Sequence, residues 1–101
     1  MTRDEVLGWL DSRRPAPPGA LGERLQGTVD HLLPAPGTPL PAYLAQLGRE
    51  LLAGVASRPA GGRELALDLL AADAFVTYAF EAQAEEDVGM LAQVAEGIHG
   101  S

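Results

Sequence analysis

The sequence contains neither lysine nor cysteine, and it has few aromatic residues. Without lysine no Schiff base can form, and without cysteine there is no thiol nucleophile, disulfide, or cysteine-ligated zinc or iron–sulfur centre. Aromatic residues make up 5% of the chain, whereas hydrophobic residues make up 47%. The core must therefore consist mainly of Leu, Ala and Val, and the abundance of Ala and Leu favours helices over strands.

Basic charge is also scarce. All 7 basic residues are arginines, against 14 acidic residues, and the net charge is −7. Only Arg13 and Arg14 are adjacent, so the chain lacks the concentrated basic surface that a nucleic acid or an acidic membrane requires. We therefore expect neither a nucleic-acid nor a membrane partner.

The length and the first residues predict the organisation and location of the chain. A length of 101 residues fits one domain, residues 1–101, with a single core. The lack of cysteine is typical of a reducing compartment, and no apolar signal segment follows the start Met-Thr-Arg-Asp-Glu. We expect a cytoplasmic protein.

Clusters of proline and glycine divide the chain into helical segments. Thr2 is placed to cap the first helix, with Glu5 three residues later to complete a capping box. Apolar residues then recur at spacings of three and four between the breaks. The pattern predicts helices over residues 3–13, 18–33, 40–57, 63–85 and 87–99. The predicted fold class is all-α, a compact antiparallel bundle of four main helices plus the short N-terminal helix.

The segment 63–85 is the most unusual of these, because it contains no glycine, no proline and few polar residues. On a helical wheel two nearly opposite sides are apolar. One side carries Leu65, Leu69, Ala72, Val76 and Phe80, and the other carries Leu67, Ala71, Ala74, Phe75 and Tyr78. Such a helix is expected in the middle of a bundle, or else shared with a second subunit.

Repeated acidic residues exclude a membrane span for this segment. Charges at Glu64, Asp68, Asp73 and Glu81 would each cost several kcal/mol inside a bilayer. The apolar surplus is therefore expected to be covered by protein. The residues predicted at a protein interface are Trp9, Leu67, Phe75 and Tyr78. For Trp9 the alternative is a cation–π contact with Arg13, four residues later on the same helix.

Asp73, Thr77 and Glu81 form a narrow polar stripe on the long helix. Such carboxylates can take part in acid–base chemistry or hold a metal, but a stripe of this kind is also typical of the side of a helix that meets water. Asp73 is the acid to test first, as either a structural or a functional group.

A second polar pattern lies near the C-terminus. Glu96 and His99 have the Glu-x-x-His spacing of di-iron bundles, with Glu81 and Glu85 as further metal ligands, although a second Glu-x-x-His is missing. No residue set forms a catalytic or cofactor-binding motif, so neither enzyme activity nor a cofactor is expected.

Two functions follow from these observations. The first is a non-enzymatic protein–protein interaction or adaptor domain that self-associates, as a homodimer, through apolar helix surface. The alternative is a helical protein that binds a small ligand or a metal ion through acidic residues of the central and last helices. Its polar groups would be Asp73, Glu81, Glu85, Glu96 and His99.

Overall fold

The computed structural model describes residues 1–57 and 62–100, and the side chains of 1–57 and 62–97. Four helices make up the described chain: α1 (Arg3–Asp11), α2 (Gly19–His31), α3 (Leu40–Ala56) and α4 (Arg63–Gly100). No strand is present in this part of the chain. The all-α class is thus confirmed, with four helices in place of the five expected.

The helices begin where the local sequence favours a start. The Thr2 side chain accepts a hydrogen bond from the backbone N–H of Glu5 at 3.2 Å, which caps α1. Pro18 and Pro39 stand directly before α2 and α3, and Pro41 lies within the first turn of α3. Proline is tolerated there because the first helical N–H groups have no partner within the helix.

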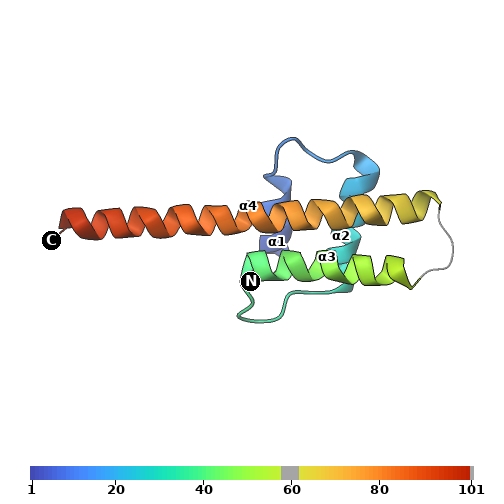
Figure 1. Cartoon of the computed structure of the whole chain (residues 1–101), viewed down its shortest axis with the longest axis horizontal. Helices are drawn as coiled ribbons and strands as arrows, with labels where there is room; N and C mark the ends of the chain where they lie inside the picture. The colour runs from blue at the N-terminus through green and yellow to red at the C-terminus, as the bar shows by residue number, and fades with distance from the viewer. Residues whose placement is uncertain (58–61, 101) are drawn as a thin grey trace.

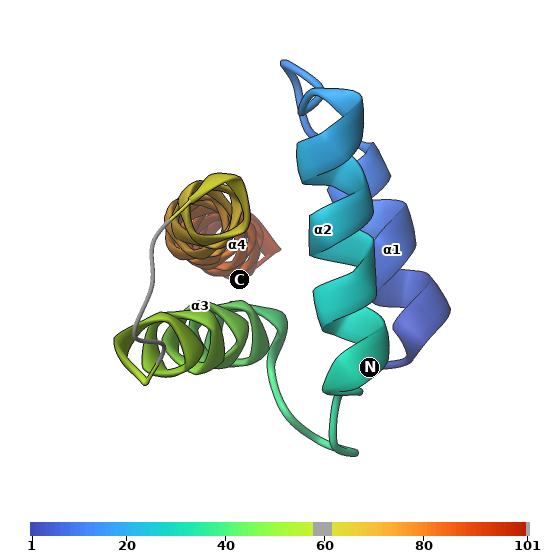
Figure 2. The ribbon, with the colours of Figure 1, turned by 90° about the vertical axis from the view of Figure 1, so that its right-hand side faces the viewer.

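The helices form two layers that run across each other (Figures 1 and 2). The long helices α3 and α4 form an antiparallel hairpin, and α1 and α2 lie side by side on one side of it. The other side of the hairpin, which we call its outer side, has no helix against it. The expected compact antiparallel bundle is therefore confirmed only in part: each layer is antiparallel, but the two layers cross.

The core lies between the two layers and along the α3–α4 contact. Every helix contributes to it, and its fully buried side chains include Val6, Val29, Tyr43, Leu44, Leu47 and Phe75. Small residues bring α3 and α4 close together. A Cβ atom on Gly48 would lie 3.2 Å from the Val76 Cγ2 and 3.4 Å from the Ala72 carbonyl oxygen. Gly48 of α3 is thus level with residues 72–76 of α4.

The predicted turn at residues 85–87 is absent, because α4 continues to Gly100. The three residues there are two glutamates and an aspartate, with no proline or glycine to interrupt the helical hydrogen bonds. The Gln83 side chain donates to Asp87 at 3.0 Å, a pairing one turn apart that a continuous helix allows. The predicted helices 63–85 and 87–99 are one helix of 38 residues.

This helix determines the shape of the molecule. At about 1.5 Å per residue it is about 57 Å long, and the molecule measures 61 × 27 × 21 Å. The radius of gyration is 16.0 Å, against about 13 Å for a compact domain of this size. The C-terminal part of α4 extends beyond the other helices (Figure 1), and every described side chain from Gln83 to Gly97 is exposed. The molecule is elongated, not compact.

Candidate functional site

Trp9 lies in a cluster that joins the end of α1 to α4. Its ring meets Tyr78 edge to face, with centroids 6.0 Å apart and planes at 85°, and the Arg13 guanidinium lies 3.9 Å from the centroid of the indole ring. The cation–π alternative is therefore the contact that the structure contains. Trp9 and Tyr78 remain partly exposed. Both therefore form part of the molecular surface where α1 meets α4, and their contact also holds these two helices together.

Two of the candidate metal ligands belong to the same cluster. The Trp9 Nε1–H donates to Glu85 at 3.0 Å, and Arg13 donates to Glu85 at 2.7 Å and to Glu81 at 3.5 Å. The hydrogen bond from Trp9, followed by that from Arg13, lowers the pKa of the Glu85 carboxyl below its usual value. Through these contacts Glu81 and Glu85 hold the C-terminal end of α1 and the residues after it against α4. Beyond Glu85, α4 extends past the other helices.

The remaining acidic candidates lie apart from this cluster. Asp73 is exposed on α4, and Glu96 is exposed on the protruding end of the helix. The side chain of His99 lies outside the described residues. Among the described side chains, no group of three or more His, Asp or Glu comes together as a metal site would require.

The buried acid of α4 is Asp68, which the sequence pattern did not single out. Its side chain is 3% exposed and accepts a hydrogen bond from the Arg24 Nε at 2.5 Å, so that an ion pair joins α2 to α4. A signal for this burial exists in the sequence, because Asp68 lies seven residues before Phe75, on the same side of the helix. Its partner comes from another helix and could not be read from spacing alone.

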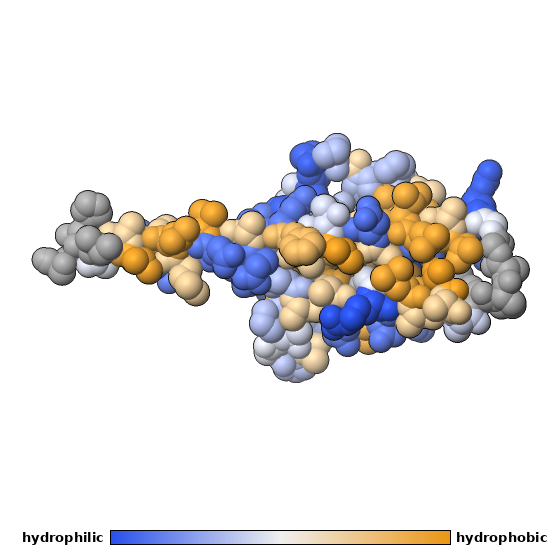
Figure 3. Space-filling model, in the orientation of Figure 1, coloured by the Kyte–Doolittle hydropathy of each residue, from blue (hydrophilic) through white to orange (hydrophobic). Residues whose placement is uncertain are grey.

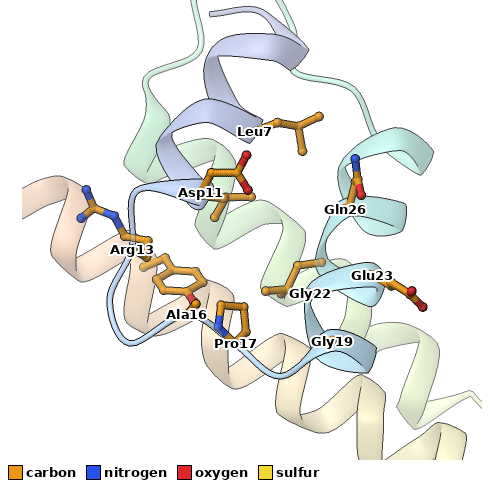
Figure 4. A pocket seen from close by; sticks show the side chains of 12 residues that line it. Leu7, Asp11, Arg13, Ala16, Pro17, Gly19, Gly22, Glu23 and Gln26 are labelled. Carbon is orange, nitrogen blue, oxygen red and sulfur yellow. The ribbon is translucent and has the colours of Figure 1, made fainter.

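A groove of about 530 Å³ is lined by residues of α1, of α2 and of the segment between them, together with Tyr78 of α4 (Figure 4). Asp11 and Glu23 lie on opposite sides of it, and the Glu23 carboxylate points away from Asp11. A general acid and base, or two metal ligands, would have to point toward one bound group. The groove therefore brings together no catalytic pair among the residues that line it.

The other predicted interface residues divide between the core and the surface. Phe75 is fully buried within the chain, where it packs with the core cluster. Its placement at an intermolecular interface was therefore wrong, because no part of this side chain reaches the surface. Leu67 is half-buried beside Asp68, where both line a small hollow with Arg24.

The surface of α4 exposes many large apolar side chains. The large apolar side chains that α4 exposes are Leu69, Leu70, Val76, Phe80, Val88, Met90, Leu91 and Val94. Phe80 is 74% exposed and Leu91 is 68% exposed. Figure 3 shows apolar residues gathered over the two long helices on the outer side of the hairpin and again along the protruding end.

Apart from Leu70, which lies on another side of α4, we divide these exposed residues into two regions by their position along the helix. The outer face consists of Leu52 of α3 together with Leu69, Val76 and Phe80 of α4. The protruding end, residues 86–97, carries Val88, Met90, Leu91 and Val94. Within the described chain, no helix is long and apolar enough to cross a membrane.

Comparison with protein families, with characterised proteins and with solved structures gives no match for this chain.

Proposed function

We propose that this chain is a non-enzymatic protein–protein interaction domain that self-associates through the apolar surface of α4. The observation that carries the proposal is the row of large apolar side chains that α4 leaves exposed from Leu69 to Val94. Contiguous apolar patches beyond a few hundred Å² are rare on monomeric proteins and mark interaction surfaces. A fully exposed apolar side chain gains about 1.5–3 kcal/mol when a partner buries it.

The polar groups support an interaction role in preference to catalysis. Glu81 and Glu85 pair with Arg13, and Asp68 pairs with Arg24. The pair with Arg24 joins α4 to α2, and the pairs with Arg13 join α4 to the segment that directly follows α1, so these groups hold the helices in place. Ligand or metal binding through the acidic residues stays an untested alternative, and no arrangement of the described side chains favours it.

Light scattering during size-exclusion chromatography, over a range of concentrations, tests self-association. We expect a mass that approaches twice the 10.5 kDa of one chain. Phe80→Ser removes the most exposed aromatic side chain of α4 and is expected to shift the protein toward the monomer. Leu33→Ser is the matched control, because Leu33 is 58% exposed but lies between α2 and α3. A monomer at every concentration would exclude the proposal.

A further inference from the structure

We infer that a second copy of this chain packs on the outer face of the α3–α4 hairpin, with Arg49 of each copy against Asp73 of the other. This inference rests on the proposed self-association and adds its surface, its symmetry and its charged contacts. It concerns the outer face alone and not the protruding end of α4.

The outer face is an apolar seam between two antiparallel helices. Gly48 packs against Ala72 and Val76, and Leu52, one turn later on α3, lies level with Leu69 on α4. Leu52 is 46% exposed and Leu69 is 45% exposed. The hairpin thus buries half of each of these side chains and leaves the other half for a partner. In Figure 2, α1 and α2 lie on the opposite side of the α3–α4 hairpin.

Arg49 of α3 and Asp73 of α4 lie beside this apolar seam. Arg49 lies four residues after Ala45 and three before Leu52, so these three share a side of α3. Asp73 has the same spacing from Leu69 and Val76 on α4. Arg49 and Asp73 are both exposed, and in the described part of the chain neither forms an ion pair.

The two charges also occupy the same level along the hairpin. Arg49 follows Gly48, and Asp73 follows Ala72, and a Cβ atom on Gly48 would lie 3.4 Å from the Ala72 carbonyl oxygen. A two-fold axis parallel to the helices would place α3 of one copy on α4 of the other at an unchanged level. Arg49 would then face the partner's Asp73, and the contact would occur twice.

The charges distinguish this arrangement from the other symmetric one. A two-fold axis perpendicular to the helices, at the same level, would place Arg49 against Arg49 and Asp73 against Asp73. Like charges brought together in an interface are unfavourable, so the charges favour the first axis.

The protruding end is a poorer site for a second copy. It follows Glu85 and contains Glu86, Asp87 and Glu96, and no arginine occurs after Arg63. Two copies that packed there would bring acidic groups together on a chain whose net charge is already −7. Among the described residues, the outer face instead has Arg49 and Asp73 beside its apolar side chains, one charge of each sign, and is complementary to itself.

Charge reversal tests the inference. We expect R49E alone and D73R alone each to raise the dimer dissociation constant at least tenfold in sedimentation equilibrium, because each change creates two like-charge contacts per dimer. An equimolar mixture of R49E and D73R restores opposite charges at both contacts. It is therefore expected to form a heterodimer with a dissociation constant within about threefold of the wild type. The double variant R49E/D73R also has opposite charges at both contacts, so we expect its homodimer to have a dissociation constant within about threefold of the wild type.

Two controls accompany the variants. E96R makes the same change of charge as D73R, but on the protruding end. We expect the dimer dissociation constant of E96R to be no higher than that of the wild type. Circular dichroism is expected to show wild-type helicity for R49E and D73R, because both side chains are exposed and outside the ion pairs of the fold.

The outcomes separate the two proposals. If the wild type is a dimer and both single variants dimerise as tightly, the outer face is not the interface, although self-association stands. Single variants that dissociate and do not recover when mixed would overturn the Arg49–Asp73 contact. A wild type that stays monomeric would overturn this inference and the proposed function together.

Discussion

At the scale of single residues, the ion pair between Arg24 and Asp68 holds α2 against α4. The Asp68 side chain is 3% exposed, whereas that of Arg24 is 38% exposed. A hydrogen bond to a charged group contributes about 1.5–3 kcal/mol when one partner is buried. The two residues are therefore not equivalent, because loss of the arginine removes a hydrogen bond from a buried carboxylate, whereas the arginine itself is partly in contact with water.

We expect Arg24→Ala to lower the free energy of unfolding by about 2 kcal/mol. Arg49→Ala, which removes an exposed arginine outside the ion pairs of the described chain, is the control for loss of one positive charge. Urea denaturation of both variants, at a concentration where the protein is monomeric, measures the difference. Equal stability of the two would show that the Arg24–Asp68 contact adds nothing to the fold.

A buried phenol makes the stability depend on alkaline pH. Burial, and to a lesser degree the charge of Asp30, raises the pKa of Tyr43 to about 12, above its value of 10.0 in an unfolded chain. The Tyr43 hydroxyl donates to the Leu32 carbonyl oxygen at 2.6 Å. The neutral phenol therefore stabilises the fold below pH 10, and this contribution is lost as the pH rises through about 12.

We expect Tyr43→Phe to lose about 1 kcal/mol at neutral pH, because the Leu32 carbonyl loses its donor. Between about pH 10 and 12 the melting temperature of the variant should fall less steeply than that of the wild type. A smaller decline in the melting temperature of Tyr43→Phe is still expected, since burial also raises the pKa of Tyr78. Parallel melting curves over this range would show that the ionisation of Tyr43 is not linked to unfolding.

Some of these residues could be identified from the sequence and others could not. Trp9, Tyr78, Glu81 and Glu85 were all singled out, and the structure brings them together. Spacing along α4 places Tyr78, Glu81 and Glu85 on one side of that helix, but the contact with Trp9 of α1 comes from the packing of the two helices. The sequence offered Glu81 and Glu85 as metal ligands, whereas in the structure both accept hydrogen bonds from Arg13. The Arg24–Asp68 pair is separated by 44 positions, and no local pattern specifies a contact between two different helices.

At the scale of elements, α4 is a helix whose two halves have different surroundings. The first half packs against α3 and α2, and the second half, residues 86–97, is exposed on all sides in this chain. An isolated helix of about 12–15 residues is only marginally stable in water, and each interior glycine costs about 1 kcal/mol relative to alanine. The protruding end should therefore fray unless a partner covers it.

We expect Gly89→Ala to stabilise this end. No atom lies within 4 Å of a Cβ on Gly89, so the methyl group meets no obstacle. A gain of about 1 kcal/mol would slow amide hydrogen exchange in residues 86–97 about fivefold. Gly27→Ala in α2, where a Cβ also meets nothing, should leave exchange in 86–97 unchanged. Equal exchange in Gly89→Ala and the wild type would indicate that this end is already held firmly.

At the scale of the whole molecule, the layers leave one side of the α3–α4 hairpin uncovered. Two helices cover the inner side, and none of the helices that the structure describes covers the outer side. If two chains associate there, folding and association are linked, because an unfolded chain has no such face. Stability then depends on protein concentration.

We expect the melting temperature of the wild type to rise on the order of 5 °C over a hundredfold increase in concentration. Phe80→Ser, with the exposed ring removed, should show a smaller rise, and Leu33→Ser should behave as the wild type. Differential scanning calorimetry at several concentrations measures this. A melting temperature independent of concentration in the wild type would argue against a dimer that dissociates on unfolding.

The sequence by itself determined the helical class, the helix starts at Thr2 and after the prolines, and the two apolar sides of the segment 63–85. These features depend on caps, breaks and periodicity, which act within a few residues of each other. Only the tertiary structure decided that the layers cross, that Phe75 is buried while Phe80 is exposed, and that α4 continues past Glu85 without a partner. A helical wheel shows which sides of a helix are apolar, but coverage of each side depends on where the other helices lie, and that follows from packing over the whole chain.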